Sequence, residues 1–96
     1  DTIRGFLIMA SNPKAIGKAV NFGSGRDYTI NEIARLIVDI SGSKSKIIHV
    51  KQRMSEVDKL LCDYSYANKL FGFKPEVSLK EGLKRNIEYE KKKRGI

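Results

Sequence analysis

Two short polar motifs constrain this chain more than any other feature, because each marks the first turn of a helix. Thr29 is followed three residues later by Glu32, and Ser78 in the same way by Glu81. This is the spacing of a capping box, in which the hydroxyl and the carboxylate each satisfy an amide proton that the first turn leaves unpaired. Apolar residues then recur at helical spacing and predict two amphipathic helices. Their expected buried stripes are Ile30, Ile33, Ala34, Ile37 and Ile40, and Leu79, Leu83 and Ile87.

A helix over residues 1–10 is predicted from a third apolar stripe. Asp1 is placed to cap it, since a short carboxylate accepts the free amide protons of a first turn. Pro13 prevents the helix from continuing, because proline disfavours helical geometry in the residue before it. The stripe that we expect to be buried consists of Ile3, Phe6, Leu7 and Ala10.

A short helix further along the chain is expected to end at Phe71. Either Asp63 or Ser65 is placed to cap its first turn. Gly72 follows the last turn, where glycine readily takes a left-handed conformation, and Pro75 stops any continuation. We therefore expect four helices in all.

We expect two or three short strands. β-Branched and aromatic residues predict them at residues 19–22 and 46–50, and the apolar run at residues 60–62 is the candidate for a brief third. Helices and strands that alternate along a chain are typical of an α/β layer. A chain of this length can bury one modest hydrophobic core, and no repeat or low-complexity linker interrupts it. We therefore expect a small single α/β domain that spans residues 1–96.

The chain is strongly basic, with a formal net charge of +8. A charge of this size suits nucleic acid, an anionic lipid surface or a phosphorylated ligand as a partner. The cations are spread along the sequence, except for a run at residues 91–94. This distribution also fits a solvated, lysine-rich surface.

A single cysteine, Cys62, excludes an internal disulfide. Together with the single histidine, His49, it cannot build a zinc site, so we expect no metal. Cys62 follows two leucines, which indicates a buried and inert thiol. A reducing, cytoplasmic compartment is the natural expectation. No apolar run approaches the roughly 20 residues of a membrane span, so we expect no membrane partner.

Motifs that would mark a complete enzyme are missing from the sequence. Gly23-Ser24-Gly25 lacks the third glycine of a dinucleotide loop and the Gly-Lys-Ser/Thr ending of a P-loop, so a tight turn is expected. Tyr89 and Lys93 match a Tyr-x-x-x-Lys pattern, but they lie in a lysine-rich tail where such spacing arises by chance. We therefore expect no catalytic residue in this chain.

Arg53 has the chemistry best suited to a ligand contact. A guanidinium presents a planar fork of donors that matches phosphate oxygens, and it keeps its charge at any relevant pH. Glu56, three residues later, can orient this fork or accept hydrogen bonds from sugar hydroxyls. An exposed ion pair worth at most about 1 kcal/mol is the alternative interpretation of the same two residues.

Several stretches form a pattern when they are taken in order. They are Asp1-Thr-Ile-Arg-Gly-Phe6, Val20-Asn-Phe-Gly-Ser-Gly25, Thr29-Ile-Asn-Glu32, Asp63-x-Ser-x-Ala67, Leu70-x-Gly-Phe-x-Pro75 and Ser78-Leu-Lys-Glu-Gly-Leu83. Together they resemble the C-terminal part of the extended short-chain dehydrogenase/reductase family, which includes NAD-dependent nucleotide-sugar epimerases and 4,6-dehydratases. Each stretch is weak by itself, whereas the ordered set across nearly the whole chain is specific. Tyr66 and Phe73 stand where the family usually has lysine and tryptophan.

The resemblance implies a role for Arg53 and Glu56. In that family the arginine of an R-x-x-D segment contacts the diphosphate of a nucleotide sugar. Glu56 lies seven residues before Asp63, as the acid of that segment does in the family. The resemblance therefore implies that Arg53 binds the diphosphate. Glu56, longer than the usual aspartate, stands where the family binds ribose hydroxyls.

The resemblance also implies what lies elsewhere in a longer enzyme. The glycine-rich NAD loop and the catalytic residues belong to the family's N-terminal Rossmann domain. NAD is therefore expected in the parent enzyme and not on this fragment. We expect the chain to be the C-terminal substrate-binding lobe and to be inactive on its own. Its expected partners are a nucleotide-diphosphate sugar and the N-terminal Rossmann domain of the same parent chain.

Two alternatives stay open from the sequence. A stand-alone basic module would bind RNA or DNA through Lys and Arg gathered on one face with exposed aromatic rings. Phe6, Phe22 and Phe71 occupy core-like positions instead, which argues against nucleic acid as a partner. The other alternative is a purely structural lobe, in which Arg53 has no role without its partner domain.

Overall fold

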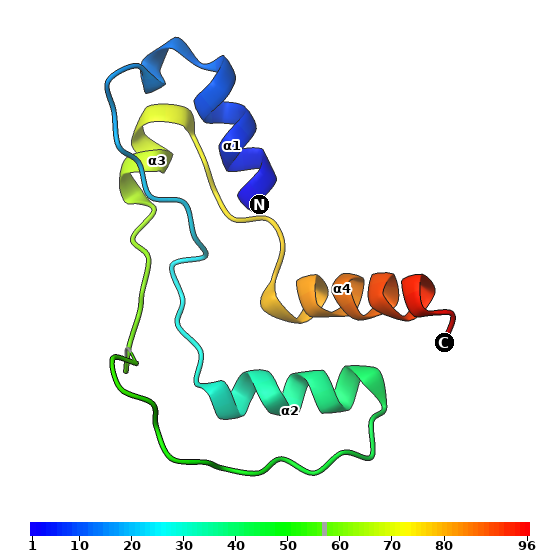
Figure 1. Cartoon of the computed structure of the whole chain (residues 1–96). Helices are drawn as coiled ribbons and strands as arrows, with labels where there is room; N and C mark the ends of the chain where they lie inside the picture. Colours follow the sequence, from blue (N-terminus) through cyan, green and yellow to red (C-terminus); the bar gives the residue numbers. More distant parts are fainter. Residues whose placement is uncertain (57) are drawn as a thin grey trace. The chain divides into compact units, whose positions relative to one another are not determined.

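The computed structural model describes residues 1–56 and 58–96 and shows a small helical domain (Figure 1). The four α-helices of these residues are α1 (Thr2–Ser11), α2 (Ile30–Ser41), α3 (Ser65–Phe71) and α4 (Leu79–Arg94). A short 3-10 helix, η1 (Pro13–Ala15), follows α1. The four predicted helices are therefore confirmed, in the expected order.

The chain divides into two compact units, and each is built from two separate stretches. The first, which we call the α1–α3 unit, consists of Asp1–Asp27 and Lys59–Val77. The second, which we call the α2–α4 unit, consists of Tyr28–Asp58 and Ser78–Ile96. The helices that share a unit are therefore not consecutive in the sequence.

The strands expected at residues 19–22, 46–50 and 60–62 are not formed in the described part of the chain. β-Branched residues favour a pleated surface that packs against neighbours, and a strand is not stable without a hydrogen-bonded partner. These segments have a composition that suits a strand, but they are not paired with another segment by backbone hydrogen bonds. The α/β class is therefore wrong for the described residues, whereas the small single domain with its helices is confirmed.

The predicted capping boxes are formed to different extents. Thr29 Oγ1 accepts a hydrogen bond from the Glu32 amide at 3.0 Å, and Glu32 Oε2 accepts one from the Thr29 amide at 2.9 Å. Ser78 Oγ accepts a bond from the Glu81 amide at 3.2 Å. Glu81 Oε1, however, accepts from Arg85 instead of closing the box. The first box is complete and the second is half formed.

α3 ends as the sequence predicts, but its N-cap residue is Tyr64, whose side chain makes no capping hydrogen bond. The expected cap by Asp63 or Ser65 is therefore wrong, although Asp63 Oδ1 accepts a hydrogen bond from the Ser65 amide at 2.9 Å. Gly72 ends the helix in the left-handed conformation, with a φ of 68°. A residue with a Cβ would be strained there.

The core of the α1–α3 unit is aromatic. Phe73 is 1% exposed and meets the Phe22 ring edge-on, with ring centroids 4.9 Å apart. Tyr64 also contacts Phe73 edge-on at 6.1 Å, and Phe71 stacks on Phe22 at 6.2 Å. Edge-to-face pairs of this kind add about 0.5–1.5 kcal/mol to the effect of burial. Ala67 is fully buried beside them.

α1 packs on this core through a face that the sequence pattern did not mark. Gly5 is buried, and a Cβ on it would lie 3.0 Å from Phe22 Cγ, so a larger residue here would press on the Phe22 ring. The Arg4 guanidinium lies 4.6 Å from the centroid of the Phe73 ring, which is a cation–π distance. The stripe expected to be buried is therefore largely exposed: Ile3 at 73%, Phe6 at 72% and Leu7 at 64%.

Asp1 is the N-cap residue of α1, but its side chain does not cap that helix. Its carboxylate accepts a bond from the Val77 amide at 3.0 Å and from the Glu76 amide at 3.2 Å. It also pairs with Arg4 at 3.1 Å. The expected cap is thus replaced by a long-range contact that holds the start of α1 to the segment after α3.

In the α2–α4 unit, the two helices pack against each other (Figure 1). No residue of either helix is fully buried. Lys91 Nζ donates to the Ser41 carbonyl at 3.2 Å, which places a cation at the negative end of α2. Ile30 and Ile37 are exposed, contrary to the prediction. The half-buried members of the predicted stripes are Ile33, Ala34 and Ile40, and Leu79, Leu83 and Ile87.

Candidate functional site

Arg53 and Glu56 lie in the connection between α2 and α3, within the α2–α4 unit. Arg53 Nε donates to Glu56 Oε1 at 2.9 Å across a tight turn. Ser55 takes a left-handed φ of 66° in this turn, a conformation that a residue with a Cβ seldom adopts. The Arg53 side chain is 88% exposed and that of Glu56 39%. The two predicted site residues are thus adjacent and accessible.

The contact with Glu56 leaves the outer part of the Arg53 guanidinium open to solvent. Among the described residues, the pair is joined through Nε and Oε1, and neither the Nη groups nor Glu56 Oε2 makes a further hydrogen bond. An exposed ion pair contributes at most about 1 kcal/mol, so an anion can compete with it at small cost. Because two parallel N–H donors match two phosphate oxygens, Arg53 can hold a phosphate group while Glu56 restrains the side chain.

Two side-chain hydrogen bonds fix the segment that carries Arg53. His49 Nε2 lies 2.8 Å from Asn31 Oδ1, which joins the segment to the first turn of α2. Gln52 Nε2 donates to Asp58 Oδ1 at 3.1 Å. The turn that presents Arg53 is therefore connected to the helical part of its own unit.

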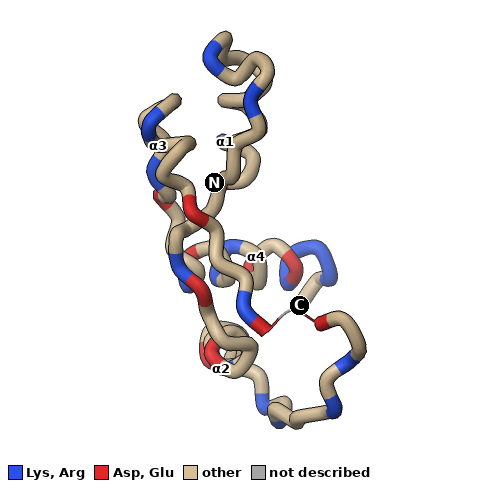
Figure 2. The backbone as a smooth tube through the Cα atoms, turned by 90° about the vertical axis from the view of Figure 1, so that its left-hand side faces the viewer, with Lys and Arg blue, Asp and Glu red and all other residues tan. Residues whose placement is uncertain are grey.

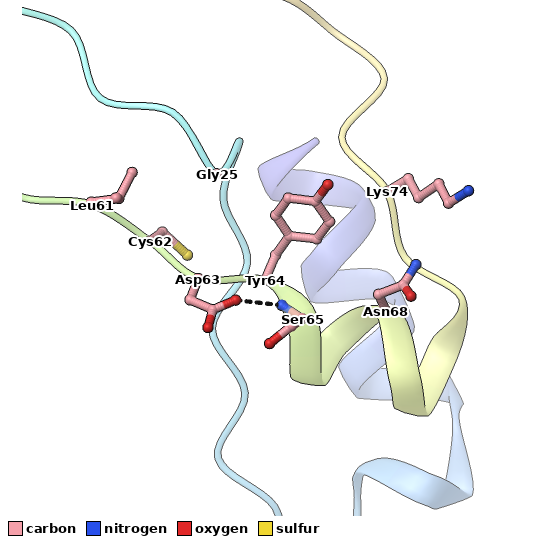
Figure 3. A pocket seen from close by; sticks show the side chains of 8 residues that line it. All are labelled: Gly25, Leu61, Cys62, Asp63, Tyr64, Ser65, Asn68 and Lys74. Carbon is pink, nitrogen blue, oxygen red and sulfur yellow. Dashed lines mark hydrogen bonds between the residues drawn. The ribbon is translucent and has the colours of Figure 1, made fainter.

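A separate pocket of about 650 Å³ lies in the α1–α3 unit (Figure 3). It forms where Tyr64 packs against the turn at Gly25, since a Cβ on Gly25 would lie 2.7 Å from Tyr64 Cε1. Gly25 also has a φ of 71°. The lining residues are Gly25, Leu61, Cys62, Asp63, Tyr64, Ser65, Asn68 and Lys74.

Two polar side chains of this pocket are already used by the fold. Asp63 accepts the Ser65 amide proton (Figure 3), and this bond, followed by one from the Ser65 hydroxyl, lowers the pKa of Asp63 below its ordinary value of 3.8. Asn68 Nδ2 donates to the Phe73 carbonyl at 3.0 Å. Lys74 points away from Asp63 in Figure 3. The pocket therefore presents no convergent set of catalytic groups.

Sequence reasoning did not find this pocket. Arg53 and Glu56 do not line it, since they belong to the other unit. It arises from the contact between Gly25 and Tyr64, which are far apart in the sequence, and neither residue belongs to a motif that signals a cavity. Some of its lining residues were singled out from the sequence, but only for other roles: Gly25 for a tight turn, Cys62 as a buried thiol, and Asp63 and Ser65 as candidate helix caps.

The turn at Gly23–Gly25 does not fit a dinucleotide cofactor. A Cβ on Gly23 would lie 2.5 Å from the Cys62 Cβ, so this glycine makes room for a side chain rather than for a pyrophosphate. No helix N-terminus follows the turn directly, since α2 begins only at Ile30. Within residues 1–56 and 58–96, no group of His, Cys, Asp and Glu side chains is arranged to hold a metal ion. None of the helices described combines the length and the apolar character that crossing a bilayer requires.

The sequence is similar to curated nucleotide-sugar enzymes over most of its length. It is 37% identical over 84 residues, 88% of the chain, to the "Putative UDP-glucose 4-epimerase" of Methanocaldococcus jannaschii. It is 33% identical over 73 residues, 75% of the chain, to a UDP-glucuronate 4-epimerase of Thermodesulfobacterium geofontis. It is also 33% identical over 90 residues, 93% of the chain, to UDP-glucuronic acid decarboxylase 1 of Danio rerio.

The chain belongs to the extended short-chain dehydrogenase/reductase family. The resemblance drawn from the sequence motifs is thereby confirmed, and the matched region is the C-terminal part of the relatives. The chain spans about a quarter of their length: 27%, 23% and 21% of the three relatives above. No family model matches the chain, and neither does any solved structure.

Positive charge in this short-chain dehydrogenase/reductase segment is distributed over both units (Figure 2). The longest run, residues 91–94, lies at the end of α4. On the same helix, Arg85 pairs with Glu81 and Arg94 pairs with Glu90. Interspersed charges of both signs are typical of a solvated helix face.

Proposed function

We propose that this chain is the nucleotide-sugar-binding C-terminal lobe of an NAD-dependent nucleotide-sugar epimerase or dehydratase. Arg53 binds the diphosphate of the substrate, and Glu56 accepts hydrogen bonds from ribose hydroxyls. NAD and the catalytic residues belong to an N-terminal Rossmann domain of the same longer chain, in the cytoplasm. The lobe turns over no substrate by itself.

The observation that carries the proposal is an exposed arginine fork in a chain similar to nucleotide-sugar enzymes. The names of the relatives differ in the base and in the sugar, from UDP-glucose and UDP-glucuronate to GDP-L-fucose. Their common chemical part is a nucleoside diphosphate. A residue that binds this common part needs a positive charge and two parallel hydrogen-bond donors, and Arg53 has both.

An anchor of this kind acts at a distance from the reaction. Binding energy from the diphosphate holds the sugar in one place, so that the reacting carbon reaches the catalytic groups in the correct orientation. Arg53 therefore contributes to substrate binding and positioning and takes no part in bond making. In the longer enzyme, Arg53→Ala raises KM strongly and leaves the secondary structure intact.

The proposal is tested by titrating UDP into the isotope-labelled 96-residue chain and following the Arg53 Nε–H signal by NMR. We expect a saturable shift at Arg53 and at the neighbouring amides. Arg53→Ala lowers the affinity at least about tenfold, because a hydrogen bond to a charged group contributes about 1.5–3 kcal/mol. Arg53→Lys gives an intermediate loss, since it keeps the charge but not the fork.

Arg35→Ala is the matched control, because Arg35 is exposed on α2 and the substitution removes the same charge. An equal loss of affinity in Arg35→Ala contradicts a specific anchor at Arg53. So does the absence of any shift in the unmodified chain at millimolar UDP. Tight binding to a generic oligonucleotide with a steep dependence on salt supports the basic nucleic-acid module instead.

A further inference from the structure

The turn that carries Arg53 has less positive charge than the chain as a whole. Residues 51–58 contain two cations, Lys51 and Arg53, and two acids, Glu56 and Asp58, so their formal charges cancel. The whole chain has a formal net charge of +8. A site that attracts anions by charge alone gathers cations. The two acids therefore weaken the attraction of this turn for a highly charged anion.

Glu56 is the acid that acts directly on Arg53. Its Oε1 accepts a hydrogen bond from Arg53 Nε at 2.9 Å, so a carboxylate charge lies against the guanidinium. Asp58 differs, because its Oδ1 accepts from Gln52 Nε2 at 3.1 Å. An anion that binds to the Nη groups of Arg53 therefore also lies close to the Glu56 carboxylate.

This geometry separates hydrogen bonding from charge at the site. The Nη groups of Arg53 still present two N–H donors to two phosphate oxygens. The charges of Arg53 and Glu56 nearly cancel for a ligand that lies beside both. Each additional negative charge on the ligand is attracted by the guanidinium and repelled by the carboxylate, so it adds little affinity.

Phosphates differ in charge according to how they are esterified. A terminal phosphate carries a charge of about −1.5 to −2 at pH 7. A phosphate that is esterified on both sides has one ionisable oxygen and carries a single negative charge. Both phosphates of a nucleotide sugar are of this second kind, whereas a free nucleoside diphosphate ends in a terminal phosphate.

We propose that Glu56 makes the Arg53 site selective for a diphosphate that is esterified at both ends over one that ends in a terminal phosphate. This inference rests on the proposed function, in which Arg53 binds the diphosphate of a nucleotide sugar. It gives Glu56 a role in specificity besides its hydrogen bonds to ribose hydroxyls. In the longer enzyme, the selectivity weakens competition by free nucleoside diphosphates.

The exposure of the pair limits the size of the effect. The Arg53 side chain is 88% exposed and that of Glu56 is 39% exposed, so water and salt screen the repulsion between Glu56 and the ligand. We expect the Glu56 charge to change the selectivity about threefold, which is the effect of an exposed charge contact.

The test compares UDP with its β-methyl ester, in which a methyl group takes the place of the sugar and the terminal phosphate becomes a diester. Each ligand is titrated into the isotope-labelled 96-residue chain at neutral pH and constant ionic strength, and the Arg53 Nε–H signal is followed by NMR. We expect the unmodified chain to bind the ester at least as tightly as UDP, although the ester has less charge.

Glu56→Gln keeps an oxygen that accepts from Arg53 Nε and removes the charge. We expect it to raise the ratio of the UDP affinity to the ester affinity about threefold. Any hydrogen bond that the variant loses to a ribose hydroxyl affects both ligands alike, because they have the same ribose. Such a loss therefore cancels in the ratio.

Asp58→Asn is the matched control, because it removes an acid of the same turn that bonds to Gln52 instead of Arg53. It changes the affinity ratio less than Glu56→Gln does. An unchanged ratio in Glu56→Gln, or an equal change in both variants, overturns the selectivity by Glu56 and leaves the proposed function in place. If neither ligand shifts the Arg53 signal of the unmodified chain, the proposed function fails and this inference fails with it.

Discussion

The two units of this chain are stabilised in different ways. In the α1–α3 unit, Phe73 is 1% exposed and lies in a cluster of aromatic rings. In the α2–α4 unit, no residue of either helix is fully buried, and side-chain hydrogen bonds cap the start of both helices. The comparison teaches that burial stabilises the first unit, whereas the second depends more on interactions within each helix.

The outward faces of α1 and α4 differ in the same chain. α1 exposes Ile3, Phe6 and Leu7, whereas α4 exposes ion pairs such as Arg85–Glu81. Charged side chains on a helix face remain hydrated, and apolar ones gain free energy when a partner covers them. The exposed face of α4 is therefore suited to solvent, whereas that of α1 is apolar.

The largest loss of stability is expected from a substitution in the aromatic core of the α1–α3 unit. Phe73→Ala removes the buried ring that contacts Phe22 and Tyr64, and lowers the free energy of unfolding by about 3–5 kcal/mol. Leu83→Ala, at a half-buried position of α4, costs about 1 kcal/mol because less apolar area is lost. Urea unfolding followed by circular dichroism measures both. Equal losses would show that the two units depend on burial alike.

A smaller loss of stability is expected from substitutions at the first turns of the two helices in the α2–α4 unit. Thr29→Ala removes the hydroxyl that accepts the Glu32 amide proton and costs about 1 kcal/mol. Ser78→Ala costs less, because the second box is only half formed and its bond is longer. Thermal unfolding of the two variants ranks them. A larger loss in Ser78→Ala contradicts the difference between the boxes.

The smallest effect is a dependence of stability on pH at the start of α3. The pKa of Asp63 is lowered, first by the Ser65 amide and then by the Ser65 hydroxyl. A carboxylate with a lowered folded-state pKa stabilises the fold above its unfolded value, and this contribution is lost as the pH falls through the folded value. Asp63→Asn therefore lowers the urea midpoint at pH 7. When the urea midpoints of the unmodified chain and the variant are plotted against pH, the two curves converge below about pH 4. Curves that stay parallel in acid would show that Asp63 does not cause the pH dependence of stability.

Two signals confined to one helical turn were read correctly from the sequence. The box at Thr29 and Glu32 and the end at Gly72 both depend on residues a few positions apart. The family resemblance was also visible, because it rests on the order of short motifs. The placement of Arg53 and Glu56 in one turn follows from their spacing, and their role as a diphosphate site stays a prediction.

Errors occurred where distant parts of the chain decide the outcome. Asp1 was expected to cap α1 and instead binds the amides of Glu76 and Val77. The apolar stripe of α1 has the periodicity of a buried face, but Gly5 allows the other face to approach Phe22 more closely. The expected strands have the composition of strands, but none of the described residues pairs with them.

The sequence by itself determined where α2 begins and where α3 ends, because a capping box and a left-handed glycine act through neighbours within one turn. It also determined the family, because the order of the motifs along the chain can be recognised without knowledge of the tertiary contacts. Only the tertiary structure decided which face of α1 is covered and which extended segments stay unpaired. Burial and strand pairing depend on surfaces far away in the sequence, and periodicity marks a face as apolar without showing what lies against it.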